Sequence, residues 1–359
     1  FFQAEDGIRD SVASRGRGDV YKRQAQEEVL KIDGEVGFNP NLGPIKELFD
    51  QGSLAVINGI GYPTPNRSHF RSRDIWYTAE PEKVGSQGWL GAAIRDLDSK
   101  GENVLTGVNF GRGLPRALVC KGVPVASVGN LETYGLLPDM ADEKVRLNAI
   151  DAFSRLYGPS GGKDVVAQVL SETGSNALKG ADTLRTAPQK YSSTVEYADN
   201  SIAQSLKSAA QVMFSDIGTR VFYTQYQSFD THSNELQSHG KLWQDVSSAL
   251  SDFTDDLKAH GRFDDTMIFI FSEFGRRIRD NGTGCDHGSG GVAFAIGGQV
   301  NGGLYGAMPS LEEKDQTEGD LRFNNDFRAS YATILDRWLG LDPDPIVNGQ
   351  FEQFNFIGK

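Results

Sequence analysis

The chain has 359 residues, of which 38% are hydrophobic and 42 are glycine, so it can bury a sizeable core and has many loops. Its 48 acidic and 36 basic residues give a formal net charge of −12, which argues against nucleic acid as a main partner. No apolar run is long enough to span a membrane, and the two cysteines, Cys120 and Cys285, lack the spacing of a metal site.

The first 24 residues differ from the rest of the chain. They are charged and rich in glycine, and they have no apolar periodicity. Gln3–Asp10 and Ser14–Gln24 look like translated sequencing-adapter DNA, so we interpret residues 1–24 as an assembly artefact, with a disordered natural tail as the alternative. We assign residues 25–359 to a single domain and expect the natural N-terminus to be missing.

A strand, a loop and a helix are predicted near the start of the remaining chain. Apolar residues at helical spacing predict a helix over Asn41–Gln51, and Leu54–Asn58 reads as a short buried strand. The loop Gly59–Asn66 is rich in glycine and proline, and a helix that carries Trp76 begins near Arg67. This order presents backbone N–H groups to an anion.

The middle and end of the chain alternate helices with short strands. Apolar runs between Val104 and Val128 predict strands or an edge hairpin. The strand Thr219–Gln225, the helix Leu242–His260 and the strand Met267–Phe271 form a βαβ unit, which indicates a parallel sheet. Further helices are predicted over Gly88–Leu97, Ala141–Tyr157, Ile202–Phe214 and Phe327–Leu339.

The stretch from Asp264 to Gly306 organises the prediction of a site. Met267–Phe271 is an unbroken apolar run, typical of a strand buried on both faces, and Glu273 follows at its carboxyl end, where open α/β sheets bind ligands. Asp286 and His287 precede the next apolar segment, Val292–Ile296. A carboxylate after one strand and an Asp-His pair before the next can converge on one point, and that point could hold a metal.

Carboxylates and imidazoles gather at these predicted strand ends. Four of the five histidines lie beside strand ends or in loops next to carboxylates, whereas His260 sits near a helix C-terminus and receives no chemical role. Mixed carboxylate and imidazole ligands suit zinc, manganese or iron. The candidate metal ligands are Asp230, His232, Glu273, Asp286 and His287.

Each of these candidates also has a structural interpretation. Asp230 can cap a turn, with His232 in a local hydrogen bond. Glu273 can pair with Arg276 or Arg277 as a structural bridge. Asp286 and His287, in a glycine-rich loop, are the pair whose setting most favours function.

A second group of candidates surrounds the predicted helix after Leu54–Asn58. Ser68 is either a helix N-cap or a nucleophile, and Thr64 competes for the nucleophile position. We take Ser68 and His69 as candidate catalytic residues. Arg67 and Arg71 are candidate substrate-binding residues that would neutralise an oxyanion.

Several of these segments together resemble a bacterial family called domain of unknown function 1501, which is described as sulfatase-like and resembles the alkaline phosphatase superfamily. The resemblance runs from about Gly37 to the C-terminus. The segments that carry it are RSHFRSRDIW (Arg67–Trp76), FDTH (Phe229–His232), SEFGRR (Ser272–Arg277), DHG (Asp286–Gly288), GGLYG (Gly302–Gly306) and DFRASYATILDRWLGL (Asp326–Leu341).

The resemblance implies a three-layer α/β/α domain with a mostly parallel central sheet. Enzymes of that superfamily use two metal ions to hydrolyse phosphate or sulfate esters. One ion activates a nucleophilic side chain, and a covalent intermediate forms before water breaks it. By this resemblance the chain is expected to be a metal-dependent hydrolase whose partner is a small-molecule or polymeric ester.

The chain departs from the superfamily pattern at a ligand position. Where the superfamily has Ser-Asp-His-Gly after a strand, this chain has Ser272–Gly275, so Glu273 can replace the Asp but Phe274 cannot replace the His. This departure puts a complete two-metal site in doubt. It also favours the alternative function, an exported, non-catalytic binding or scaffold protein on a decayed hydrolase fold.

The other ligand positions match more closely. Asp230 and His232 correspond to an earlier Asp-and-His element with tighter spacing than usual, so His239 is an alternative partner for Asp230. His287 corresponds to the last ligand histidine.

The front of the chain departs as well. The family is expected to begin with a strand and a Gly-Gly-Asn-Asp-Gly segment that supplies a metal-binding Asp, but adapter-like residues stand there instead. We therefore expect the chain to lack its first central strand and one ligand, and to be weakened in stability and activity. Family members commonly carry a twin-arginine export signal, which implies an exported protein, although this chain shows no such signal.

Overall fold

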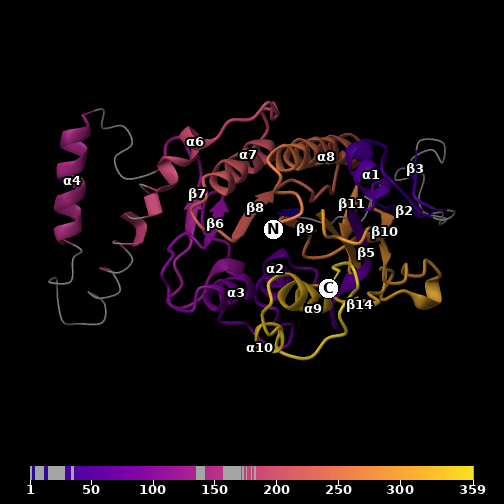
Figure 1. The fold of residues 1–359 in the computed structure, drawn as a ribbon. Coiled ribbons are helices and arrows are strands. Elements are labelled where there is room, and N and C mark those ends of the chain that lie inside the picture. Colours follow the sequence, from indigo (N-terminus) through magenta and orange to yellow (C-terminus); the bar gives the residue numbers. More distant parts are fainter. Residues whose placement is uncertain are drawn as a thin grey trace.

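A single nine-stranded sheet lies between two layers of helices (Figure 1). The computed structural model describes residues 2–4, 12–14, 29–33, 36–134, 142–156, 171, 174, 176–178, 180, 181 and 183–358. The strands are β1 (Phe2–Ala4), β5 (Leu54–Gly61), β6 (Gly107–Phe110), β7 (Ala126–Val128), β8 (Val221–Tyr226), β9 (Met267–Phe271), β12 (Gly291–Gly297), β13 (Gly303–Tyr305) and β14 (Asn325–Asp326). Their order is β13-β5-β12-β9-β1-β8-β6-β7, with β14 also paired to β5.

Parallel pairing dominates this sheet, and β12 is the exception. It runs antiparallel to both of its neighbours, β5 and β9. Because β12 is antiparallel to β9, it begins at the edge of the sheet where β9 ends. The chain between them stays at that edge as a hairpin of β10 (Arg276–Asp280) and β11 (Cys285–His287). This topology brings Glu273, Asp286 and His287 to the same edge of the sheet. The sequence predicted that they converge, but it did not predict that β12 runs antiparallel.

Both faces of the sheet are apolar, because helices cover its central strands on both sides. All eight residues of β5 are buried. Successive side chains of a strand point to opposite faces. Accordingly Leu54 and Val56 join one hydrophobic cluster, whereas Ala55 and Ile57 join the other. The continuous apolar runs in the sequence therefore reflect strands that are covered on both sides.

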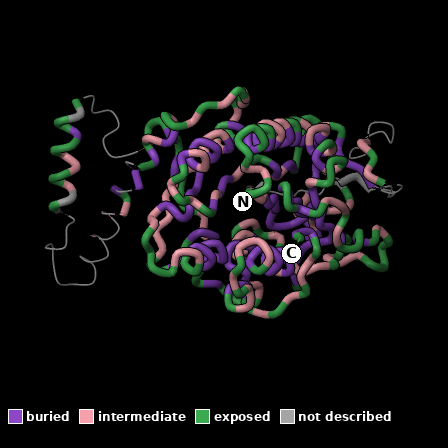
Figure 2. Tube along the Cα trace, in the orientation of Figure 1, coloured by how far each residue is buried: buried purple, intermediate pink, exposed green. Residues whose placement is uncertain are grey.

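The helices divide between these two clusters, and Figure 2 shows buried residues concentrated where the helices meet the sheet. One face carries α1 (Gly43–Asp50), α6 (Ala187–Lys190), α7 (Ser201–Phe214) and α8 (Glu235–Ala259). The other carries α2 (His69–Thr78), α3 (Trp89–Leu97), α9 (Phe327–Thr333) with its π-helical continuation Ile334–Trp338, and α10 (Asp344–Val347). The predicted α/β class with a mostly parallel sheet is confirmed.

Smaller elements complete the described chain. A three-stranded sheet, in the order β2-β4-β3, consists of β2 (Val12–Ser14), β4 (Val36–Phe38) and β3 (Leu30–Lys31). Helix α4 (Glu143–Leu156) stands apart from the main body in Figure 1. Single 3-10 turns lie at Pro40–Leu42, Arg116–Leu118 and Glu313–Asp315. Among the described residues, no helix combines the length and apolar character needed to cross a membrane.

The expectation that the natural first central strand is missing stays a prediction, although a strand of the leader occupies that place in this structure. Phe2–Ala4 forms β1 between β8 and β9 and pairs in parallel with both, with Phe2 opposite Thr224 and Ile270. Two neighbouring strand edges leave backbone groups that an extended segment can satisfy, whatever its origin. Most of the predicted leader, residues 1–24, lies outside the described residues, so the artefact interpretation stays a prediction.

Of the two alternatives predicted between Val104 and Val128, strands or an edge hairpin, the structure has separate strands. β6 and β7 pair in parallel at the edge of the sheet. The connection between them contains the 3-10 turn Arg116–Leu118, which packs near α2 and α3. A parallel pair needs such a long crossover, whereas a hairpin needs only a tight turn.

Candidate metal centre

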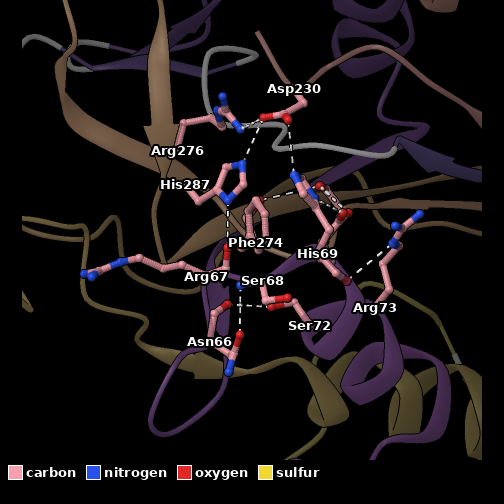
Figure 3. A network of polar contacts seen from close by, with 12 residues as sticks. Asn66, Arg67, Ser68, His69, Ser72, Arg73, Asp230, Phe274, Arg276 and His287 are labelled. Atoms are coloured by element: carbon pink, nitrogen blue, oxygen red, sulfur yellow. Dashed lines mark hydrogen bonds and ion pairs between the residues drawn. The ribbon is translucent and has the colours of Figure 1, made fainter. Parts of the chain in front are cut away.

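Three histidines and one aspartate meet at the edge where β8 and β9 end. Figure 3 shows three of the four, His69, Asp230 and His287. We call His69, Asp230, His232 and His287 the His/Asp cluster. His69 is the first residue of α2, Asp230 and His232 follow β8, and His287 ends β11. The cluster thus draws on segments far apart in the sequence that the topology brings to one place.

The carboxylate of Asp230 is the centre of this cluster. Its Oδ1 lies 2.8 Å from Nε2 of His232 and 3.0 Å from Nε2 of His287. Its Oδ2 lies 3.3 Å from Nε2 of His69. The possible ligand atoms of His69, Asp230 and His287 all lie within 4.8 Å of one another. The Nε2 atoms of three rings therefore converge on one carboxylate.

The other nitrogen of each ring faces an oxygen acceptor. Carboxylate and carbonyl oxygens accept hydrogen bonds, so each Nδ1 is placed to donate one and to leave Nε2 directed at Asp230. Metal-binding histidines typically show this arrangement, because the Nδ1 contact fixes the tautomer and the ring orientation. The three contacts are His69 Nδ1 to Glu273 Oε1 at 2.9 Å, His232 Nδ1 to Asp286 Oδ1 at 3.2 Å and His287 Nδ1 to the carbonyl oxygen of Arg67 at 2.7 Å.

Two of the Nε2 atoms face each other. His232 Nε2 and His287 Nε2 lie 2.9 Å apart, with Asp230 Oδ1 close to both. Lone pairs at that separation repel unless a positive charge lies between or beside them, either an added proton or a cation. Imidazole nitrogen and carboxylate oxygen are suitable ligands for zinc, manganese and iron, so the residues fit a divalent ion.

Charged neighbours keep Asp230 ionised. Burial raises the pKa of Asp230, but hydrogen bonds and charge from Arg276 and His287 outweigh burial and lower the pKa to about 2. The guanidinium of Arg276 is 1% exposed, lies 2.6 Å from Asp230 Oδ1 and also donates to the Cys285 carbonyl. Asp230 is therefore a carboxylate at neutral pH.

Glu273 and Asp286 lie behind the rings rather than among the converging atoms. Glu273 is fully buried and accepts from His69 and from the hydroxyl of Ser272, at 3.3 Å. A hydrogen bond from Asn281 lowers the pKa of Asp286; burial opposes this effect and His232 adds to it. In this structure the two carboxylates contact Nδ1 of His69 and of His232, and their direct ligation of a metal stays a prediction.

His69 belongs to the cluster, although the sequence suggested a catalytic role for it instead. Its ring is held between Glu273 and Asp230, on the first residue of α2. The signal in the sequence was its place in a helix that starts after the loop following β5. The sequence also placed the end of that strand at Asn58, whereas β5 continues to Gly61, so the loop before His69 is shorter than predicted.

Ser68 lies at the N-cap position of α2, but its hydroxyl makes no capping hydrogen bond. The residues on both sides of Ser68 contact the cluster, Arg67 through its carbonyl and His69 through its ring. The side chain of Ser68 is exposed. The alternative interpretation, a helix-capping serine, does not describe this hydroxyl.

The two candidate substrate-binding arginines are held by other groups. Arg67 donates to Asp320, with Nη2 at 2.6 Å from Oδ2, and its Nη1 lies 3.1 Å from Glu318. Arg71 pairs with Asp74 at 2.7 Å and donates to the carbonyls of Glu80, Pro81 and Lys83. Arg67 therefore reaches the cluster through its backbone, and Arg71 is not brought to it.

Phe274 forms an apolar wall of the cluster. Its ring centroid lies 4.9 Å from that of His69 and 4.7 Å from that of His287, and the residue is 4% exposed. The position at which the superfamily pattern has a histidine therefore contributes packing and no ligand atom.

The remaining two histidines have structural contacts away from the cluster. His239, the alternative partner for Asp230, is buried and accepts a hydrogen bond from Trp243 Nε1 at 2.8 Å. His260 stacks on Phe214 at 4.0 Å and contacts Asp256. Neither is a member of the His/Asp cluster.

Comparison with known proteins gives one family match. The family model described as "Protein of unknown function (DUF1501)" matches residues 164–349, just over half of the chain. This span contains every motif of the predicted resemblance from Phe229 onward, and it leaves out Arg67–Trp76. None of the curated proteins matches the chain.

Two solved structures show a distant similarity. One is the phosphonate monoester hydrolase SpPMH from Silicibacter pomeroyi, with a TM-score of 0.43 and 11% identity over 98% of this chain and 75% of that chain. The other is Ps i-CgsB in complex with k-i-k-neocarrahexaose, with a TM-score of 0.39 and 11% identity over 85% of this chain and 67% of that chain. Both TM-scores are below 0.5, so we base function on the side chains of this chain.

Proposed function

This chain belongs to the DUF1501 family, and from the geometry of its His/Asp cluster we propose that it is a metal-dependent hydrolase of phosphate or sulfate esters. The observation that carries the proposal is the convergence of three Nε2 atoms on the ionised carboxylate of Asp230. Each ring is oriented through Nδ1, as metal ligands require.

In this proposal the four residues of the cluster hold one divalent ion, which is zinc, manganese or iron. When bound, such an ion neutralises charge on the ester and lowers the pKa of a nearby hydroxyl or water. Glu273 and Asp286 hold the His69 and His232 rings in place. The Phe274 ring occupies the position of a further ligand, which favours one ion over the two of the superfamily.

Ser68 is the proposed nucleophile. Its oxygen would form a bond to phosphorus or sulfur while the ester oxygen leaves as the alcohol, and water would then release phosphate or sulfate and restore the serine. The hydroxyl is exposed and free of capping contacts, next to two residues that contact the cluster. The N-terminus of α2 also favours a bound anion. Arg71 has no part in this proposal, because its guanidinium is held elsewhere.

Metal content and ester hydrolysis test this proposal together. We would measure bound metal by elemental analysis, and the hydrolysis of p-nitrophenyl phosphate and p-nitrophenyl sulfate, for the wild type, Asp230→Asn and Asp216→Asn. Asp216 is an exposed aspartate with a positive φ of 55°, a conformation that asparagine also tolerates, so it is a matched control. Stoichiometric metal and turnover that Asp230→Asn abolishes and Asp216→Asn retains would support the proposal.

The second candidate is a binding protein without turnover, and the apolar wall formed by Phe274 favours it. Under this alternative the folded protein carries no stoichiometric metal, and Asp230→Asn leaves its ligand binding unchanged. Metal without turnover of either ester would keep the cluster as a metal site but reject phosphate and sulfate monoester hydrolysis.

Two finer expectations rest on family resemblance alone. We propose that the natural protein is exported by the twin-arginine route and that its substrate is a small-molecule or polymeric ester. Fractionation of the natural source would test the first, because an exported protein is recovered outside the cytoplasm.

A further inference from the structure

A polar pocket of about 710 Å³ lies beside the His/Asp cluster at the same edge of the sheet. The ends of β6, β7 and β8 and the side of α7 line it. Its residues from β8 and the following loop run from Gln225 to Ser228, two positions before Asp230. Two residues of chain span at most about 7 Å, so the pocket and the cluster are neighbours.

Amides and hydroxyls dominate the wall of this pocket that α7 forms. Gln204, Ser205, Ser208 and Gln211 all line it from that helix. Amide and hydroxyl groups can both donate and accept hydrogen bonds. Such a wall suits a ligand whose own groups also do both.

The charges around the pocket balance. Its charged lining residues are two basic ones, Arg112 and Lys207, and two acidic ones, Glu132 and Asp199. Phe110 adds apolar surface. An anion or a cation would therefore find no excess of opposite charge here, which favours a neutral ligand.

Gln211 is the residue that points to a ligand. It is 8% exposed and lines the pocket, and its side-chain amide, which has no hydrogen-bond partner in the described part of the chain, stays accessible rather than sealed in the core. An amide that no protein group engages and that stays accessible from the pocket can donate to and accept from a ligand there. By contrast, the Gln225 amide donates to the Tyr77 hydroxyl at 2.7 Å, and the Gln204 amide donates to the Ala198 carbonyl at 2.9 Å.

The backbone at the pocket is also unusual. Ser228 has a φ of 81°, a left-handed conformation that non-glycine residues seldom adopt. Such conformations persist where the surrounding structure holds them and are often found at functional sites. Here the turn directs the chain from the pocket lining to Asp230.

We propose that this pocket binds a neutral sugar unit, with the Gln211 amide as its innermost hydrogen-bonding group. Sugar hydroxyls both donate and accept, they carry no charge, and their ring carbons pack on apolar surface. The volume lies in the range of small-molecule sites. This binding is independent of the hydrolase proposed above, because it needs neither a metal nor an ester.

Saccharide binding to the metal-free protein tests the proposal. We would record saturation-transfer difference NMR with maltose, cellobiose and lactose in the presence of EDTA, and with inorganic phosphate and sulfate in separate binding titrations. The variant Gln211→Leu keeps a similar side-chain volume but removes the amide. Gln244→Leu, on the exposed face of α8 and outside the pocket, is the matched control.

The expected result is saturable binding of at least one disaccharide, weakened about tenfold by Gln211→Leu and unchanged by Gln244→Leu. Ser208→Trp, which places a large ring in the pocket, should also abolish binding, and it decides the matter if circular dichroism shows that Gln211→Leu is unfolded. Absence of binding by all three sugars, equal binding by the pocket variants, or pocket binding of phosphate or sulfate alone would overturn the proposal.

Discussion

Asp230 and Asp256 are both aspartates in contact with a histidine, yet their surroundings differ in one decisive respect. Asp256 is fully buried and accepts from the hydroxyls of Tyr191, Ser193 and Tyr197, at 2.6 to 2.9 Å. Asp230 has a side chain that is 33% exposed and, besides Arg276, faces ring nitrogens of His69, His232 and His287. Hydroxyl donors surround the first carboxylate, whereas imidazole nitrogens, which can also bind a metal ion, surround the second.

This difference separates a structural aspartate from a candidate ligand. Donors around Asp256 fasten residues 191–197 to α8, and nothing further is needed to satisfy the carboxylate. At Asp230, the neighbouring Nε2 atoms of His232 and His287 lie 2.9 Å apart and need a shared proton or a cation between or beside them. Type and burial of the residue alone would have ranked Asp256 first, so the identity of the neighbouring atoms is the better guide to function.

The largest expected effect concerns catalysis at the Asp230 side of this comparison. Ser68→Ala should lower the kcat for p-nitrophenyl ester hydrolysis about 1,000-fold or more, because the nucleophile is removed. Stability should change by less than about 0.5 kcal/mol, since the hydroxyl makes no cap contact. Steady-state kinetics and urea denaturation give the two numbers.

Thr64→Gly is the control for this prediction. Thr64 is the competing nucleophile, and its positive φ of 52° accommodates glycine. Full activity in Ser68→Ala together with loss in Thr64→Gly would reassign the nucleophile.

The next effect contrasts the two aspartates directly. Asp256→Asn should destabilise the protein by about 2 kcal/mol, because charge-assisted hydrogen bonds from three hydroxyls are lost or reoriented. Asp230→Asn should cost about 1 kcal/mol or less in metal-free protein, since its remaining oxygen still accepts from Arg276 and its charge is screened. Equal losses in urea denaturation would remove the distinction between the two sites.

A smaller effect tests the support of the cluster. Glu273→Gln keeps the shape of the side chain but weakens the carboxylate contact with His69, so metal affinity should fall about 10- to 100-fold. Competition with a chromophoric chelator measures this affinity. Glu196→Gln, on an exposed surface, should leave the affinity unchanged. An unaltered affinity in Glu273→Gln would mean that His69 is not a ligand.

Much of the fold could be predicted from the sequence, because buried strands and amphipathic helices leave clear periodic patterns. Met267–Phe271 was predicted at the bounds that β9 has, and the family resemblance is confirmed by the match over residues 164–349. The direction of β12 could not be predicted, since an apolar run reads the same in either direction. For the same reason the sequence could not decide whether β6 and β7 pair in parallel or as a hairpin.

The candidate site was predicted less completely. The sequence gathered the right elements, and Asp230, His232 and His287 do meet. The sequence could not distinguish the residues that face Asp230 from Glu273 and Asp286, which contact the far side of the rings. That distinction depends on which ring nitrogen faces which oxygen. His69 was given another role for this reason. Gln211 left no signal at all, since a glutamine in an amphipathic helix is ordinary until its missing partner is known.

The smallest effect is a pH dependence that distinguishes the Asp230 carboxylate from an ordinary exposed one. Its pKa of about 2 in the folded protein lies below the value of about 3.9 for an unfolded aspartate, so its contribution to stability is present above the unfolded pKa and is lost as pH falls through the folded pKa. The difference in unfolding free energy between metal-free wild type and Asp230→Asn should therefore be constant from about pH 7 to pH 5 and shrink between about pH 4 and pH 2. Urea denaturation across that range measures it, with Asp216→Asn as the exposed control. A difference that stays constant to pH 2 would mean that Arg276 and His287 do not hold Asp230 in its charged form, and the electrostatic contrast with an ordinary carboxylate would fail.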